Sequence, residues 1–394
     1  MNLIKIKYKF FLKIFCLICV FLSVLLIFKR GIINLDMSEN LYYEQNSENE
    51  NLRTSGSWTF RSLYIDDSES YGNGTWDWAE SQPWCKGFGN WSHPYILENI
   101  TIKNCSSNIR IENSNVYFII RNCSIYDNSK TAISFNNVSN GQIIENYLYN
   151  NVYRGIFLRD SNDNTISGNI LQKNDDHGIY LQDSNDNTIS GNKIQKNDNH
   201  GIYSQDSNDN TIKNNNIDNN KNIGIFLTIN CISNKIKGNK VKNHDMTGIQ
   251  IQDDSNKNEI IDNTVEENGN DGIWIIRSKN TIIKDNTVKN NGMNGILLSD
   301  SSENEIIEND IIKNKNWGIS LDENSNENYI SKNYLEGNGY GCIKDKGSNN
   351  IIEDNTCIDW LFWILVIGIP VAGLALAIII IIKKKKAKKI RVEN

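Results

Sequence analysis

The sequence predicts an all-β protein: a right-handed, single-stranded parallel β-helix, or solenoid, with coils of about 23 residues. Three observations predict this fold. A peptide recurs every 23 or 24 residues, aliphatic columns follow the same period, and columns of asparagine lie between them. The repeat contains no apolar stripe of helix length, so its units are strands. Transmembrane helices are expected to flank the solenoid at both ends.

The repeat is clearest where two copies are nearly identical. Gly155-Ile-Phe-Leu-Arg-Asp-Ser-Asn-Asp-Asn-Thr-Ile-Ser-Gly-Asn returns at Gly178 as Gly-Ile-Tyr-Leu-Gln-Asp-Ser-Asn-Asp-Asn-Thr-Ile-Ser-Gly-Asn. Three aliphatic columns begin at Ile133, Ile143 and Leu148 and continue, coil after coil, to Ile319, Ile330 and Leu335. Each position alternates with polar neighbours, as in a half-buried strand. Three short strands per coil are therefore expected to stack their inward side chains.

Two asparagine columns separate the strands. One runs from Asn146 to Asn333, and the other from Asn151 to Asn338 with His244 replacing one asparagine. Asparagine tolerates the left-handed bend expected at a corner, and its amide can hydrogen-bond the same amide one coil away. The glycine that opens each copy is expected to supply another tight corner.

Two apolar segments predict membrane attachment. Residues 10–28 fit a signal peptide or an uncleaved signal-anchor, and their length and the absence of a small-residue cleavage site favour the anchor. Residues 361–382 are long enough to cross a bilayer and are followed by a run of lysines. The positive-inside rule places both termini in the cytoplasm and the β-helix outside the cell, at the cell membrane.

The expected organisation follows from these segments. It comprises a cytoplasmic N-terminus (1–9), a membrane segment (10–28), a linker (29–70), a Trp-rich N-terminal cap (71–94), the β-helix (95–360), a transmembrane helix (361–382) and a basic cytoplasmic tail (383–394). Six Asn-x-Ser/Thr sequons, which all precede the regular repeats, agree with an external location. They are Asn73, Asn90, Asn99, Asn104, Asn122 and Asn137.

Composition narrows the function classes and leaves the cysteines open. A net charge of −6 over 394 residues argues against nucleic acid as a partner. Cys105 and Cys123 stand in matching contexts and could form a disulfide if they stack in neighbouring coils. Cys342 and Cys357 are a second candidate pair, at the C-terminal end of the solenoid.

The repeat Gly-Ile-x-Leu-x-x-Ser-x-x-Asn-x-Ile-x-x-Asn-x-Ile-x-x-Asn resembles the parallel β-helix repeats of the NosD-like family, which is also grouped with carbohydrate-binding and sugar-hydrolase (CASH) domains. The resemblance covers about residues 72–360 and implies the fold. It leaves the function open, because the family includes copper-site maturation factors, polysaccharide lyases, epimerases and surface proteins, often archaeal.

An outward aromatic column is the main candidate for ligand binding. In Gly-Ile-x-Leu the Ile and Leu point inward, so the residue between them faces out. This column and the polar residues two positions further on suit the faces and hydroxyls of sugars, although aromatic stacking that only stabilises the sheet is the alternative. The candidate ligand-binding residues are Phe157, Tyr180, Tyr203, Phe226, Arg159, Gln182 and Gln205.

Acidic and histidine columns are weaker candidates for chemistry. Asp160, Asp183 and Asp206, with His177 and His200, could provide acid–base groups for a lyase, epimerase or glycosidase. His177 and His200 with a carboxylate could also hold a metal ion. The simpler interpretation is turn chemistry repeated in near-identical coils. We therefore expect no cofactor and a surface protein that binds carbohydrate or another surface partner without catalysis, with a polysaccharide-processing enzyme or a NosD-like metal-handling protein as alternatives.

Overall fold

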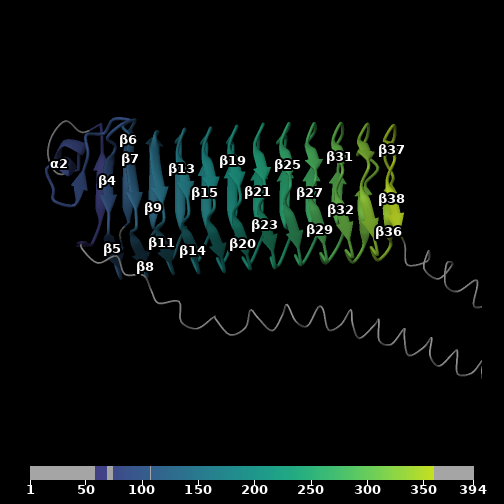
Figure 1. Cartoon of the computed structure of the whole chain (residues 1–394), viewed down its shortest axis with the longest axis horizontal. Coiled ribbons are helices and arrows are strands. Elements are labelled where there is room, and N and C mark those ends of the chain that lie inside the picture. Colours follow the sequence, from purple (N-terminus) through teal and green to yellow (C-terminus); the bar gives the residue numbers. More distant parts are fainter. Residues whose placement is uncertain (1–57, 69–73, 107, 359–394) are drawn as a thin grey trace, which may run out of the picture. The chain divides into compact units, whose positions relative to one another are not determined.

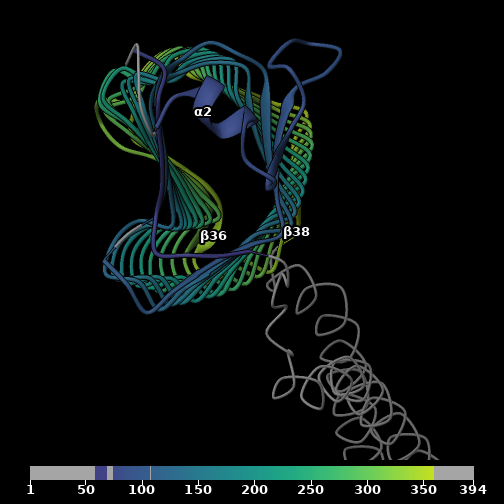
Figure 2. The ribbon, with the colours of Figure 1, turned by 90° about the vertical axis from the view of Figure 1, so that its left-hand side faces the viewer.

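The computed structural model describes residues 58–68, 74–106 and 108–358, which form a parallel β-helix (Figure 1). Three sheets run along the helix axis, and a full coil contributes one strand to each of them (Figure 2). The predicted membrane segments 10–28 and 361–382 lie outside the described residues. Within the described ranges, no helix is long and apolar enough to cross a bilayer.

The three sheets contain 13, 12 and 13 strands. Sheet A consists of β1 (Trp58–Phe60), β5 (Ile100–Lys103), β8 (Ser124–Tyr126), β11 (Tyr147–Tyr149), β14 (Ile170–Gln172), β17 (Lys193–Gln195), β20 (Asn216–Asp218), β23 (Lys240–Lys242), β26 (Thr264–Glu266), β29 (Thr287–Lys289), β32 (Asp310–Ile312), β35 (Tyr334–Glu336) and β38 (Thr356–Ile358). Sheet B consists of β2 (Leu63–Asp66), β6 (Ile109–Ser114), β9 (Ile133–Val138), β12 (Ile156–Arg159), β15 (Ile179–Gln182), β18 (Ile202–Gln205), β21 (Ile225–Thr228), β24 (Ile249–Gln252), β27 (Ile273–Ile276), β30 (Ile296–Ser299), β33 (Trp317–Leu321) and β36 (Gly341–Asp345). Sheet C consists of β3 (Cys85–Lys86), β4 (Tyr95–Glu98), β7 (Phe118–Arg121), β10 (Gly141–Ile144), β13 (Thr165–Ser167), β16 (Thr188–Ser190), β19 (Thr211–Lys213), β22 (Lys235–Lys237), β25 (Glu259–Ile261), β28 (Ile282–Lys284), β31 (Glu305–Ile307), β34 (Tyr329–Ser331) and β37 (Ile351–Glu353).

The predicted aliphatic columns fill the interior. Ile179 pairs in register with Ile202 in sheet B, and Ile166 with Ile189 in sheet C. The three columns are completely buried or nearly so in every coil from Ile133 to Leu335. Successive coils therefore bury one continuous apolar core, as expected for strands with a period of two residues.

The solenoid begins earlier than the predicted boundary at residue 95. β1 and β2 pair in parallel with β5 and β6, so residues 58–66 belong to the first coil and not to the linker assigned to 29–70. Their apolar residues are interrupted by Arg61 and Ser62, and this brief strand–corner–strand pattern was too short to separate from a linker. The single described helix, α2 (Trp76–Glu80), follows and lies across the open end of this coil (Figure 2). Trp76 is 2% exposed and stacks on Tyr95, with ring centroids 4.8 Å apart.

Buried asparagine side chains join each coil to its neighbours. The Oδ1 atom of Asn192 accepts from the backbone N–H of Asn169 at 2.9 Å and from its Nδ2 at 3.0 Å. Nδ2 of Asn192 in turn donates to the backbone carbonyl oxygen of Ile166 and to the side-chain Oδ1 of Asn215. The same pattern repeats along both predicted columns, which confirms the expected amide-to-amide contacts. Each amide thus satisfies backbone groups that a corner would otherwise leave unpaired in the interior.

The conformation of these corners differs from the expectation. The ladder asparagines are not left-handed; the residue immediately before each one is. That residue varies widely: it is Gly191 before Asn192, Lys196 before Asn197 and Glu145 before Asn146, with φ between 54° and 65°. Asparagine is therefore required at the corner for its hydrogen bonds, and the bend itself tolerates many residue types at a modest cost.

Two further ladders were not predicted. A third asparagine column begins at Asn164 and continues through Asn187, Asn210, Asn234 and Asn258 with the same backbone-to-Oδ1 bonds. A serine column accepts backbone N–H groups through Oγ, as Ser184 does from Ser161 at 3.1 Å. The serine and the asparagine of these two ladders form the motif Ser-x-x-Asn in the repeat, but both residue types are equally typical of ordinary turns.

The glycine that opens each copy is required for space and not for a bend. Gly201 does not have a positive φ, but a Cβ atom there would lie 2.5 Å from Cγ2 of Ile217 and 2.6 Å from the carbonyl oxygen of Gly224. Gly191 is the opposite case, with φ of 65° and no heavy atom closer than 4.0 Å to a Cβ. The predicted role of the glycine column as a tight corner is therefore wrong.

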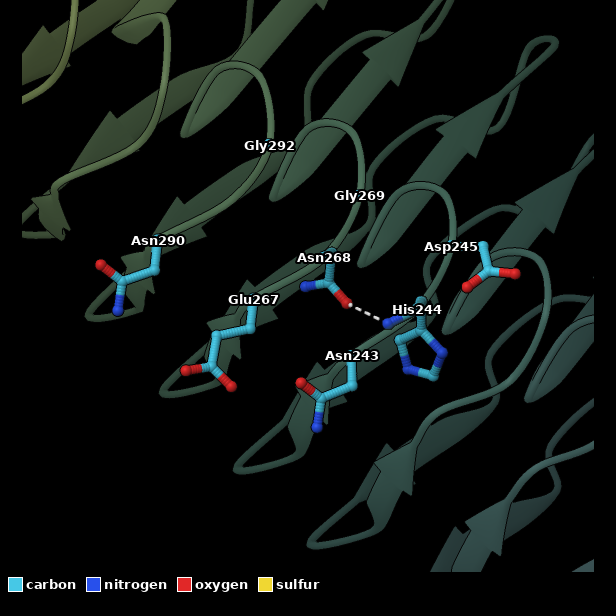
Figure 3. A pocket seen from close by; sticks show the side chains of 8 residues that line it. All are labelled: Asn243, His244, Asp245, Glu267, Asn268, Gly269, Asn290 and Gly292. Carbon is cyan, nitrogen blue, oxygen red and sulfur yellow. Dashed lines mark hydrogen bonds between the residues drawn. The ribbon is translucent and has the colours of Figure 1, made fainter. Parts of the chain in front are cut away.

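His244 takes the place of an asparagine in the second ladder. Its Nδ1 accepts from the backbone N–H of Asn220 at 3.1 Å, and Nε2 lies 3.2 Å from the carbonyl oxygen of Ile217. The backbone N–H of His244 donates to Oδ1 of Asn268 (Figure 3). A neutral imidazole protonated on Nε2 reproduces the acceptor and donor of an asparagine amide.

One of the two predicted cysteine pairs forms a disulfide. Cys342 and Cys357 are bonded, with Cα atoms 5.8 Å apart, and close the last described coil. Cys105 and Cys123 are both free. They are separated by 18 residues instead of a coil length, and they occupy different ladders: the backbone N–H of Cys105 donates to Asn128, and that of Cys123 to Asn146. They do not stack, so the condition for this candidate disulfide is not met.

Replacing one ladder amide should destabilise the solenoid strongly. Asn192→Ala leaves the backbone N–H of Asn169 and the carbonyl of Ile166 without these partners, at a cost of roughly 2–5 kcal/mol in the free energy of unfolding. Asn324→Ala, at an exposed loop position, is the control and should change stability by less than about 0.5 kcal/mol. Equal effects in a denaturant titration would contradict the ladder's role.

The two classes of glycine should respond differently to the same substitution. Gly201→Ala forces side chain and backbone apart and should cost several kcal/mol, on the order of an overpacked core site. Gly191→Ala meets only the left-handed backbone penalty of about 1 kcal/mol. Thermal unfolding of both variants measures the difference, and a larger loss for Gly191→Ala would refute the steric assignment.

Acid should weaken the ladder at His244. Burial lowers the pKa of His244 from 6.5 to about 4, so the unfolded chain takes up this proton first as the pH falls. The neutral His244 side chain makes its full contribution to the free energy of unfolding above pH 6.5. This contribution, roughly 3 kcal/mol, is lost as the pH falls towards 4. His244→Asn should retain stability at neutral pH and lose less of it between pH 6.5 and 4. Parallel unfolding curves for both proteins over this range would exclude the mechanism.

Candidate functional site

The outer face of sheet B carries the predicted aromatic column. Phe157, Tyr180, Tyr203 and Phe226 lie in register on β12, β15, β18 and β21, each directly over the next. The column continues as Gln250 and Trp274 on β24 and β27. None of these side chains belongs to the interior core, because the neighbouring inward positions on each strand fill it.

The rings stack on one another instead of lying side by side. Ring centroids are 5.1 Å apart for Phe157 and Tyr180, 4.8 Å for Tyr180 and Tyr203, and 5.4 Å for Tyr203 and Phe226, with planes inclined by 27–33°. Tyr180 is only 7% exposed, whereas the other three rings are half-buried. A ligand therefore meets ring edges and hydroxyl groups, while most ring faces are already occupied by stacking.

A second column covers the rings from one side. It consists of the residues before the opening glycines: Arg154, His177 and His200. The guanidinium carbon of Arg154 lies 4.6 Å from the ring centroids of both Phe157 and Tyr180. Its Nε is 3.2 Å from Oδ2 of Asp176, so the cation is held by a carboxylate and by two aromatic rings. The sheet B side of the coil bends inward, at β36 in Figure 2.

The two histidines are buried and uncharged at neutral pH. Burial lowers the pKa of His177 to about 4 and that of His200 to about 3. Nδ1 of His200 accepts from the backbone N–H of Ile223 at 3.1 Å. The pH at which these histidines become charged is therefore well below neutrality, and they act as packing and hydrogen-bonding groups around the rings.

Their geometry is unfavourable for a shared metal ion. The imidazole planes of His177 and His200 are parallel within 7°, with centroids 5.1 Å apart. A metal ion lies about 2 Å from the nitrogen and close to the ring plane, so one ion cannot lie in both planes. Among the described residues, no group of three or more histidine, cysteine, aspartate or glutamate side chains is placed to hold a metal ion.

The polar column beside the rings is partly free to bind a ligand. Gln205 accepts from the hydroxyl of Tyr180 at 3.1 Å and donates to Asp206 at 3.2 Å. Arg159 and Gln182 have no side-chain hydrogen bond or ion pair within the described part of the chain, and Arg159 is exposed. These two side chains offer a guanidinium and an amide at the rim of the aromatic column.

The acidic column ends sheet B at a corner. Asp160, Asp183 and Asp206 have φ values of 48–50°, so they occupy the left-handed position that closes each strand. They are exposed or half-exposed and repeat in consecutive coils. The geometry thus agrees with their role as turn residues. Asp176, which directly precedes His177 in the sequence, is the carboxylate that contacts Arg154 and His177.

Another aromatic group on sheet A was missed. Tyr126, Tyr147 and Tyr149 project from β8 and β11, and the rings of Tyr147 and Tyr149 are stacked with centroids 5.9 Å apart. Nε2 of Gln172 donates to the hydroxyl of Tyr147 at 2.6 Å. The alternation Tyr-Leu-Tyr around an inward leucine is the signal that could have identified this group.

A shallow pocket of about 660 Å³ lies at the corner formed by His244 and its neighbours (Figure 3). It is lined mainly by side-chain amides, the carboxylates of Asp245 and Glu267, and the backbone at Gly269 and Gly292. The imidazole of His244 is committed to the ladder, so the polar groups that this pocket offers to a ligand are its amides and carboxylates.

Comparison with known proteins finds matches to two family models. The family model of the right-handed β-helix region matches residues 85–241, and that of the periplasmic copper-binding protein NosD matches residues 230–359. No curated protein matches the sequence.

Solved structures share the architecture at low identity. The catalytic domain of a GH87 α-1,3-glucanase in complex with tetrasaccharides is 15% identical with a TM-score of 0.53; the match covers 76% of this chain and 63% of that one. A double mutant of the periplasmic alginate epimerase AlgG is 17% identical with a TM-score of 0.50, over 66% and 78% of the two chains. At these identities the likeness shows the fold alone. The family matches and the stacked coils described above show that this chain is a right-handed parallel β-helix repeat protein, with similarity to NosD over residues 230–359.

Proposed function

We propose that this β-helix lies outside the cell and binds carbohydrate along the outer face of sheet B, from Phe157 to Phe226. The observation that carries the proposal is the combination of aromatic edges with two unpaired polar side chains, Arg159 and Gln182, on neighbouring strands. Sugars present both C–H faces and hydroxyl groups, and a site for them needs apolar surface beside hydrogen-bond donors and acceptors.

The rigidity of this face supports binding. Stacking between Phe157 and Tyr180, and the Arg154–Asp176 contact behind them, hold the rings in single positions. A preorganised face loses little side-chain entropy when a ligand binds. Because equivalent residues recur every coil, the face suits an extended polymer better than a small compact molecule.

The external location has independent support. The Cys342–Cys357 disulfide is typical of an oxidising compartment, and the NosD family model is that of a periplasmic protein. We propose that residues 361–382 anchor the solenoid in the cell membrane.

A glycan array on the purified chain tests the proposal. Arg159→Ala and Gln182→Ala should each weaken binding of the recognised glycan by about ten- to a hundredfold, because each removes a hydrogen bond worth about 1–3 kcal/mol. Thr188→Ala and Lys213→Ala on sheet C are the matched controls and should bind normally.

Three outcomes decide between the candidate functions. Loss of binding in the sheet B variants alone supports a binding face. Unsaturated, epimerised or shortened sugars recovered after incubation with the protein would identify a polysaccharide-processing enzyme instead. Absence of binding to every glycan would contradict the carbohydrate proposal.

A further inference from the structure

The Asn-x-Ser/Thr sequons are concentrated in the first coils. Of the 11 asparagines from Asn73 to Asn137, six belong to a sequon, whereas none of the 47 from Asn140 to Asn355 does. Part of this contrast follows from the fold. In the ladders of Asn192 and Asn164, each asparagine is followed two positions later by an inward aliphatic residue, as Asn192 is by Ile194, and so cannot belong to a sequon.

Asparagines in the left-handed corner positions provide a closer comparison, because the residue two positions later does not belong to the hydrophobic core, although Gly292, after Asn290, has no room for a side chain. Five described asparagines up to residue 137 have positive φ, and four of them are sequons: Asn99, Asn104, Asn122 and Asn137. Nine from residue 140 onwards have positive φ, and none is a sequon: Asn140, Asn150, Asn214, Asn219, Asn230, Asn243, Asn280, Asn290 and Asn349.

The later coils also lack sequons where the hydroxyl residue is present. Thr264, Thr287 and Thr356 stand two positions after a left-handed corner, but the corner residues are Asp262, Asp285 and Asp354. A carboxylate suits this conformation as asparagine does, yet it offers no amide nitrogen for modification. The later left-handed corners therefore lack the acceptor amide where the hydroxyl residue is present, and lack the hydroxyl residue where the amide is present.

Four of the five early sequons that the structure describes have an exposed asparagine. Asn104, Asn122 and Asn137 are exposed at three different corners of the solenoid, with φ of 49–57°. Asn90 lies in the loop before β4, where its Oδ1 accepts from the backbone N–H and the hydroxyl of Ser92. This loop also exposes 80% of Trp91 and 68% of Phe88, an apolar surface that a neighbouring glycan would shield.

We propose that the N-terminal coils carry N-linked glycans on these asparagines, while the repeats beyond Asn137 remain bare. In the transfer, Nδ2 bonds to the anomeric carbon of a sugar held on a lipid phosphate. The bond from that carbon to the phosphate oxygen breaks, the phosphate leaves with the bonding electrons, and the amide loses one proton to a base. The producing cell supplies this donor and the transferase.

The arrangement leaves the carbohydrate-binding face free. The corner column that contains Asn137 continues as Asp160, Asp183 and Asp206, so the last acceptor lies one coil before Phe157. A bulky hydrophilic chain on those later corners would project beside the aromatic column. Glycans are thus confined to the end of the solenoid where the interior is capped by α2.

Peptide mass spectrometry on the full chain from the membranes of its native cell tests this directly. Enzymatic release of N-glycans in ¹⁸O-labelled water converts each occupied asparagine to labelled aspartate. We expect the label at sequons between Asn73 and Asn137, and at none of the 47 later asparagines. Asn115→Ser completes a sequon at the exposed left-handed Asn113 and should add a labelled site there, whereas Asn122→Gln should remove one.

The proposal rests on the external location proposed above, so intact cells are treated with protease in parallel. A chain that protease reaches but that carries no label at any sequon overturns the glycan proposal and leaves the location standing. A chain that protease does not reach overturns both. Neither result depends on whether the sheet B face binds a glycan array.

Discussion

A buried side-chain amide that bridges neighbouring coils is the interaction on which this structure depends. Each ladder asparagine accepts a backbone N–H from the coil before it and donates to a strand carbonyl of that same coil, as Asn192 does with Asn169 and Ile166. Corners interrupt the backbone ladder of every sheet, and without the amides these groups would be buried unpaired. Three asparagine ladders and one serine ladder supply the missing partners along the whole solenoid.

The ladders also explain how coils of unequal length stack. The hydrogen bonds join residues 23 positions apart in some coils and 24 in others, yet the aliphatic columns stay in register. The extra residue is absorbed after sheet B, where two consecutive residues are left-handed, Ile229 with Asn230 and Asp253 with Asp254. A β-branched residue in this conformation is costly, so the amide contacts on both sides must determine the corner.

The fold could be predicted from the sequence because its determinants are periodic. Interior positions such as Ile179 recur at a fixed spacing, and so do the amides that join the coils. The assignment of roles at the corners was harder: the same asparagine suits a left-handed bend or a buried hydrogen bond, and the opening glycine suits a bend or a close approach. Gly201 was therefore assigned to the right place for the wrong physical reason, whereas for Asn192 the predicted hydrogen bond was right and the predicted left-handed bend was wrong.

The candidate site was only partly predictable for a related reason. Alternation places Tyr180 outside the core, but it does not tell whether its neighbours lie beside the ring or on top of it. The stacking of the rings, and their contacts with Arg154 and His177, depend on the spacing of roughly 4.8 Å between paired strands and on side-chain rotamers. The contact between Asp176 and Arg154 joins residues 22 positions apart, one fewer than the coil length of 23. It can be predicted only if the number of residues at that corner is known.

Cross-linking between coils tests most directly whether equivalent positions lie one above the other. Thr165 and Thr188 face outward on β13 and β16 and are paired in register, so a Thr165→Cys, Thr188→Cys variant should form a disulfide on mild oxidation. Thr165→Cys, Ser190→Cys is shifted by two residues, which places the Cα atoms roughly 8 Å apart, too far for a disulfide. Peptide mapping should find the first cross-link in high yield and the second only in traces. Equal yields, or a preference for the shifted pair, would contradict stacking in this register.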